Sequence, residues 1–189
     1  MRRTTVIPAL LSLAIVGCGG AHLTKNAPIQ PPAGWVKHDL ATAGMSFYLP
    51  ADAAEKPMPA QALAQIAGQE DGELEQSFVG TIGQPQPRAV AVLLVVKLKE
   101  DASLDNLSKG VQKGMETKAG GASFQSTKVQ TPMGQSALIE APLETQGVKT
   151  FTSTYVWKDT KKMILLMAMN FDPSDKTLGK KIADTMQIH

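Results

Sequence analysis

A ten-residue apolar run, AVAVLLVVKL, occupies Ala89 to Leu98 and constrains the fold more than any other segment. A strand with one face in water alternates apolar and polar residues, whereas this run is apolar almost throughout. We therefore predict a β-strand that is buried on both faces. Residues 162–171 predict a second very apolar strand. A sheet that contains such strands needs helices on both of its faces.

Two segments can supply these helices. The first follows Ser103, a good N-cap residue, and repeats apolar side chains at helical spacing until Gly120 ends it. The second is predicted over residues 175–186, with Ser174 as its cap and one apolar face. A third, shorter helix is predicted at residues 60–67.

Short alternating or apolar segments predict the remaining strands. They lie at residues 35–40, 44–49, 73–82, 124–130, 134–143 and 148–157. The connections between the later strands are short, which is typical of antiparallel hairpins. We therefore expect an α+β fold, an α/β/α sandwich around a mostly antiparallel central sheet of about six or seven strands. Residues 51–60 are expected to form a loop.

The N-terminus is typical of an export signal. Met1-Arg2-Arg3 is a short positive segment, and the stretch from Val6 to Val16 is mostly apolar. That stretch is too short to span a bilayer, which requires about 20 apolar residues. We predict that residues 1–17 form a cleaved signal peptide.

The signal ends in Ile15-Val16-Gly17-Cys18, which resembles the lipobox of bacterial lipoproteins. The resemblance implies that the Cys18 thiol receives a diacylglycerol, that the signal is cut before Cys18, and that the new amine is acylated. Two or more acyl chains make such an anchor stable. Gly19, in place of aspartate, implies the outer membrane as destination in an organism that has one.

We expect residues 18–34 to be the lipidated cysteine and a flexible tether, because they are rich in Gly, Ala and Pro. Residues 35–189 would then form a single domain. Arg2 and Arg3 account for the formal charge of +2, so the chain after the signal has no net charge. This balance argues against nucleic acid as a partner, because nucleic-acid binding needs a basic surface.

The order of the predicted elements resembles the Mog1/PsbP-like fold, which includes the DcrB and LpqN families of bacterial lipoproteins. The resemblance rests on Gly34-Trp35 and GMSFYLP at residues 44–50, and on the aromatic strand around 155–157 followed by an apolar strand and a final helix. Members of this fold mostly act by binding proteins and share no catalytic centre. The resemblance therefore implies a binding function and supplies no site residues.

Motifs for catalysis or metal binding are missing from the sequence. It contains no G-x-S-x-G or S-x-x-K nucleophile motif and no phosphate-binding glycine loop. A zinc site needs about four Cys or His ligands, but the lipid would occupy Cys18, and the histidines are only His22, His38 and His189. We expect no enzyme activity, no cofactor and no metal.

Three clusters have both a functional and a structural interpretation. The acidic residues Glu70, Asp71, Glu73 and Glu75 lack the calcium-loop register, and we interpret them as a solvated edge. The thioethers of Met163, Met167 and Met169 share one strand face and could bind Cu(I), but we interpret them as core. Phe151, Tyr155 and Trp157 also share a face, which would be core or, if open, an aromatic binding platform.

We conclude that the chain is a membrane-anchored lipoprotein of the cell envelope, acting as a non-enzymatic protein-binding or envelope-maintenance factor. Its partners would be the membrane, through Cys18, and an envelope protein held by the proline-rich segments 83–88 and 50–60. One alternative is a carrier of a small ligand or of copper. Another is a hydrolase of unrecognised type, which needs a cleft with paired acidic groups or His38 beside a hydroxyl.

Overall fold

The computed structural model describes Leu23, Lys25 and residues 29–58, 72–83, 85–119, 123–145 and 147–189. The predicted signal peptide, Cys18 and the predicted helix at residues 60–67 lie outside the described residues. So do His22, Glu70 and Asp71.

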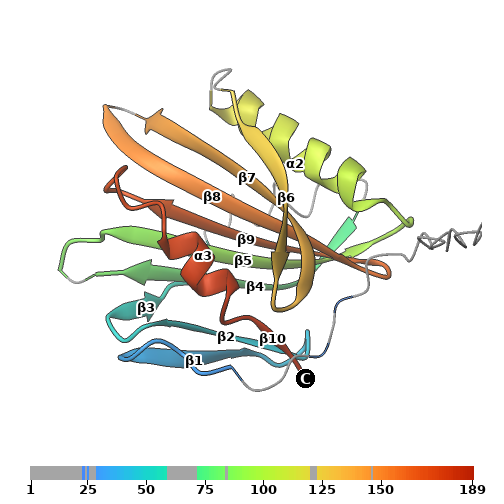
Figure 1. Ribbon diagram of the computed structural model, residues 1–189, viewed down its shortest axis with the longest axis horizontal. Coiled ribbons are helices and arrows are strands. Elements are labelled where there is room, and N and C mark those ends of the chain that lie inside the picture. Colours follow the sequence, from blue (N-terminus) through green and yellow to red (C-terminus); the bar gives the residue numbers. More distant parts are fainter. Residues whose placement is uncertain are drawn as a thin grey trace, which may run out of the picture.

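The described strands form two antiparallel sheets (Figure 1). The smaller sheet has the order β1 (Trp35–Leu40), β2 (Met45–Pro50) and β10 (Gln187–Ile188). The larger sheet has the order β3 (Ala53–Glu55), β4 (Gly72–Ile82), β5 (Ala89–Leu98), β9 (Lys162–Asn170), β8 (Val148–Asp159), β7 (Gly134–Thr145) and β6 (Gln125–Thr131). The predicted mostly antiparallel sheet of six or seven strands is thus confirmed by the larger sheet.

Two helices cover opposite faces of the larger sheet, as predicted. The helix α3 (Leu178–Ala183) packs on β8 and β9 and also contacts β2, so it joins the two sheets. It lies in front of the larger sheet in Figure 1. The helix α2 (Leu104–Lys118) packs on β7 and β8. On β8, Tyr155 belongs to the core on the α3 side and Val156 to the core on the α2 side. No helix among the described residues is long and apolar enough to cross a membrane.

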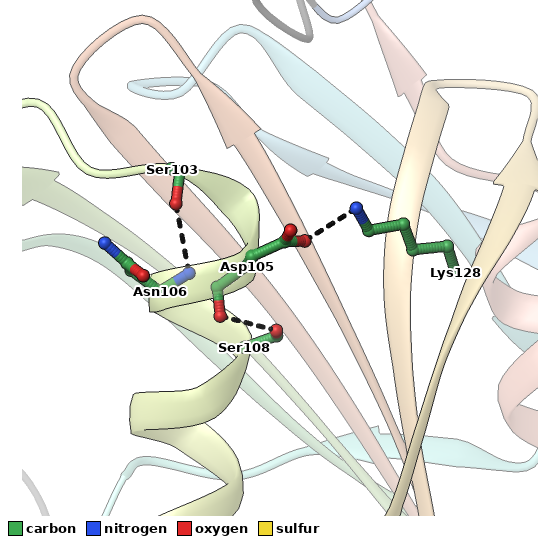
Figure 2. A network of polar contacts seen from close by, with 5 residues as sticks. All are labelled: Ser103, Asp105, Asn106, Ser108 and Lys128. Carbon is green, nitrogen blue, oxygen red and sulfur yellow. Dashed lines mark hydrogen bonds and ion pairs between the residues drawn. The ribbon is translucent and has the colours of Figure 1, made fainter.

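The start of α2 follows the sequence prediction closely (Figure 2). The backbone N–H of Asn106 donates a hydrogen bond of 3.2 Å to the Ser103 side chain, which caps the helix. Ser108 donates to the carbonyl of Asp105, and the Asp105 carboxylate pairs with Lys128 of β6 at 2.8 Å. The helix start is therefore fixed locally by its cap and tied to the sheet by an exposed ion pair.

The strand β5 has the predicted bounds but not the predicted burial. On one face the side chains from Ala89 to Val95 are buried but Lys97 is exposed, whereas the other face is buried only at Val96 and Leu98. The half-buried side chains are Val90, Val92 and Leu94. The prediction of a strand covered completely on both sides is wrong here, because α2 crosses β7 and β8 instead of β5.

The C-terminal region differs from the prediction in length. The helix predicted at residues 175–186 is only α3, and Ser174 does not cap it. The carboxylates of Asp172 and Asp175 instead accept hydrogen bonds from Ser174 and Thr177, which holds this segment in turns. The chain then ends in β10, which pairs with β2 and was not predicted. The expected loop at 51–60 likewise contains the short strand β3, which pairs with β4.

Candidate functional site

A cleft of about 640 Å³ lies where the two sheets meet. Its walls come from the segment that leads into β1, from the end of β2, from adjoining ends of β4, β5 and β9, and from α3. Its volume is within the range of about 300–1,000 Å³ that is typical of small-ligand sites. The predicted tether enters the domain at one wall, through Ala33 and Gly34.

Strand register brings the floor of the cleft together. Ile82 of β4 lies opposite Ala89 of β5, which lies opposite Asn170 of β9. The turn between β4 and β5 begins at Gly83, whose φ of +93° favours glycine. A Cβ at Gly83 would also lie only 2.9 Å from the carbonyl oxygen of Gln86. The glycine therefore allows the turn that brings Arg88, five residues later, to the rim, where its backbone N–H donates to the carbonyl of Ile82.

Asn170 is the distinctive polar group of the floor. It is only 3% exposed, and its Nδ2 has no hydrogen-bond partner among the described residues. An unpaired buried donor costs about 1–3 kcal/mol. Most buried polar groups in native proteins are paired, so this amide marks a position where an acceptor from outside the chain would be favourable.

An apolar wall stands beside this amide. Trp35 is half-buried against the core, and Ile82 and Leu178 are buried. The backbone N–H of Trp35 donates to the carbonyl of Pro32, and Ala51 donates to Gly34. These bonds fix the start of β1 against the end of β2, so the indole is held at the cleft by the backbone on both sides.

The rim carries charges of both signs. Arg88 pairs with Asp52 at 3.0 Å, and both side chains are largely exposed. The pKa of Asp172 lies below its ordinary value because the Ser174 hydroxyl and backbone N–H donate to it. The pKa of Asp175 is lowered by the backbone N–H and the hydroxyl of Thr177. Among the described residues, no group of three or more His, Cys, Asp or Glu side chains is placed to hold a metal ion.

The proline-rich segments that the sequence indicated border this cleft. Pro50, Ala51 and Asp52 line one side, and Arg88 at the end of the 83–88 loop lines another. No sequence motif marks Asn170 as a site residue, and Trp35 is marked in the sequence only by the predicted strand at residues 35–40 and by the fold resemblance. Nothing in the local pattern marks Asn170, because its role depends on strands far apart in the chain.

The two described histidines do not form a catalytic pair. His38 packs against Phe47 and Phe78, with ring centroids 5.5 and 5.0 Å away, and no hydroxyl bonds to it among the described residues. Burial lowers the pKa of His38, outweighing the nearby carboxylates of Glu55 and Asp39.

The terminal histidine, by contrast, does reach a hydroxyl. The His189 Nε2 lies 2.8 Å from the Ser46 Oγ. However, Ser46 is 0% exposed, so its hydroxyl has no access to a substrate. The geometry that a serine hydrolase needs is not present at either described histidine.

The predicted methionine face and the predicted aromatic face differ in burial. Met163, Met167 and Met169 are half-buried, and Met163 packs against the core on the α2 side, so their interpretation as core holds only in part. The cause is again the partial cover of this face of the sheet. Phe151, Tyr155 and Trp157 are buried as core, so no aromatic platform exists on that face.

The buried aromatic side chains also have a hydrogen-bond partner within the domain. Trp157 donates to the Thr131 hydroxyl at 2.9 Å, and burial raises the pKa of Tyr155 to about 12. Of the described acidic residues, Glu73 is exposed and Glu75 pairs with Lys162 at 2.9 Å. This arrangement fits the interpretation of a partly solvated edge.

A second pocket, of about 510 Å³, lies between α2 and the end of β5. Its walls include Leu107, Val111 and Met163. None of its lining side chains is an unpartnered buried polar group among the described residues. The cleft with Asn170 is therefore the better candidate for a specific binding site.

No family model matches the chain, and no curated protein matches its sequence. Solved structures do match. A cyanobacterial PsbP (CyanoP) from Synechocystis has a TM-score of 0.57 to this chain at 10% identity, over 83% of this chain and 94% of its own. The chain has a PsbP-like fold. The predicted α+β sandwich of this type is thereby confirmed.

Two further matches are similar in extent. A protein of Bacteroides thetaiotaomicron has a TM-score of 0.53 at 12% identity, over 81% of this chain and 48% of its own, so this chain spans about half its length. LpqN of Mycobacterium tuberculosis, described as involved in cell envelope biogenesis, has a TM-score of 0.49 at 13% identity, over 87% of this chain and 90% of its own. At such identities the PsbP-like likeness establishes the fold alone, because one fold hosts many functions.

Proposed function

We propose that this PsbP-like domain belongs to a lipid-anchored protein of the cell envelope that works by binding and not by catalysis. The lipobox-like Ile15-Val16-Gly17-Cys18 supports the anchor and the location. In a Gram-negative organism the protein would sit on the periplasmic face of the outer membrane. The partners in this proposal are the membrane, through Cys18, and an envelope protein.

The observation that carries the binding function is the cleft at the junction of the sheets. It combines an unpaired buried amide, an indole and a rim of mixed charge, which are features of recognition. Catalysis by a nucleophile needs a base beside it, and neither His38 nor His189 lines the cleft. The binding surface also adjoins the predicted tether, which would hold it close to the membrane.

Residues 85–88 are exposed and are the part of this surface best placed to contact a protein partner. Their prolines limit the conformational entropy that is lost on binding. Site-specific photo-crosslinking in intact cells tests the proposal. A photoreactive residue at Gln86, exposed beside the cleft, should give a reproducible adduct that mass spectrometry identifies as an envelope protein.

A matched control is Lys113, which is also exposed but lies on α2. The same adduct from both positions would indicate unspecific capture. A reproducible lack of any adduct at Gln86, and at other positions around the cleft, would count against a protein partner.

A small-ligand carrier is the second candidate, and the volume and closed floor of the cleft favour it. In that case the ligand would occupy the cleft beside Asn170. The copper version has less support, because it relies only on the shared face of three half-buried methionines.

A further inference from the structure

The floor of the cleft has an unpaired hydrogen-bond donor, so a ligand with an acceptor group would fit it. Asn170 Nδ2 is a neutral donor, buried and unpartnered among the described residues. Its cross-strand neighbours Ala89 and Phe151 are apolar. A ligand that reaches the floor gains most if it brings a hydroxyl or carbonyl oxygen to this amide without bringing a full charge into an apolar surrounding.

The rim of the cleft carries hydrogen-bond acceptors. Asp172 receives both of its hydrogen bonds on Oδ1, from the N–H and the hydroxyl of Ser174. Asp175 receives bonds on Oδ1 from Thr177 in the same way. Among the described residues neither Oδ2 has a partner, so two oriented carboxylate oxygens can accept from a ligand. The same ligand must therefore both donate and accept hydrogen bonds.

The charges of the cleft favour a neutral ligand. Arg88 is paired with Asp52, and Lys181 is close enough to Asp175 to lower its pKa. An anion would be repelled by the carboxylates of Asp52, Asp172 and Asp175. A cation would be repelled by the Arg88 guanidinium and the Lys181 ammonium. A neutral polyol avoids both penalties, because each hydroxyl donates to a carboxylate and accepts from Asn170, Arg88 or Lys181.

The walls favour a compact ring over an extended peptide. Peptides commonly bind by adding a strand to a free sheet edge. However, β4, β5 and β9, which form the floor, each have a neighbouring strand on both sides. Trp35 supplies an aromatic wall for an apolar ligand face. A sugar ring has such a face of C–H groups and a periphery of hydroxyls.

We propose that the cleft binds a neutral saccharide unit of an envelope component. This inference rests on the proposed function of the chain as a non-enzymatic envelope-binding protein. Asn170 is the specificity residue at the floor, Asp172 and Asp175 bind hydroxyls at the rim, and Trp35 packs against the ring.

Intrinsic fluorescence provides the test, because the chain has two tryptophans and only Trp35 lines the cleft. Trp157 is 0% exposed and lies elsewhere in the core. The full chain is purified in a detergent without a sugar headgroup. It is then titrated with N-acetylglucosamine tetramer, with maltotetraose and with a tetra-alanine amide peptide of similar length.

We expect a saturable change with at least one saccharide and none with the peptide. The change should persist in Trp157→Phe and vanish in Trp35→Phe. Asn170→Leu should weaken binding by about tenfold or more, as expected for one lost hydrogen bond to a buried group. Because its Nδ2 is buried and unpaired without ligand, Asn170→Leu should not lower the melting temperature, which separates a binding role from a structural one.

The control variant is Asn106→Leu, an exposed asparagine on α2 outside the cleft, which should leave saccharide affinity unchanged. The proposal is overturned if neither saccharide gives a saturable response at millimolar concentration, if the peptide binds more tightly, or if Asn170→Leu binds as well as the wild type. Failure of the saccharide would leave the photo-crosslinking result at Gln86 untouched, so the two proposals fail separately.

Discussion

Single residues set the spacing between α3 and the sheet. Gly179 faces Ser153 of β8, and a Cβ at this position would overlap the Ser153 Oγ and lie 3.1 Å from its Cβ. Both residues are buried. Gly179→Ala should therefore lower the free energy of unfolding by about 1–3 kcal/mol, as overpacking usually does. Urea denaturation measures the change.

Gly110 is the matched control for this substitution. It is exposed within α2, and a Cβ there meets nothing within 4 Å. Gly110→Ala should raise the free energy of unfolding by about 0.5–1 kcal/mol, because alanine loses less backbone entropy in a helix. Equal effects of the two substitutions would contradict the close approach of α3 to β8.

The stability of the domain should depend on pH through His38. Burial holds its folded-state pKa below the ordinary value of 6.5. The unfolded chain therefore binds a proton at a higher pH than the folded chain does, and the free energy of unfolding falls as the pH drops below about 6.5. Thermal melting between pH 7.5 and pH 5.5 should show a smaller loss in His38→Phe, which keeps the ring packed against Phe47. An unchanged slope would mean that His38 is not buried as described.

At the scale of elements, α2 gives the sharpest prediction. Ser103→Ala removes the cap shown in Figure 2 and should cost about 1 kcal/mol of stability. Lys128→Met removes only an exposed ion pair to Asp105 and should change stability by less than about 1 kcal/mol. Chemical denaturation of both variants ranks the two contributions. A larger effect of Lys128→Met would show that the tie to β6, and not the cap, holds the helix start.

Elements defined by their own sequence were predictable, and elements defined by distant partners were not. The bounds of β5 and the cap of α2 follow from local apolar patterns and from Ser103. The short strand β10 exists only because β2 offers it a free edge, more than a hundred residues earlier in the chain. The half-open face of β5 likewise depends on where α2 crosses the sheet, which no local pattern encodes.

At the scale of the whole molecule, the same limit applies to the candidate site. Two borders of the cleft, the segments 50–60 and 83–88, are predictable from the sequence, because their prolines are typical of exposed segments that contact partners. Asn170 is not predictable in this way, because its side chain becomes a buried unpaired donor only when β5, β8 and β9 align. The amino-acid pattern thus predicts the architecture and part of the rim, while the floor of the cleft is a property of the folded chain.

The central claim for the molecule is that Cys18 attaches a binding domain to a membrane. The most direct measurement is fractionation of cells that express the wild type, Cys18→Ser and, as a control that keeps the lipobox, Ser12→Ala. The account predicts that the wild type and Ser12→Ala stay in the membrane pellet after alkaline carbonate washing. It predicts that Cys18→Ser leaves the pellet with an unchanged melting temperature. Full retention of Cys18→Ser in the washed membranes would contradict the claim.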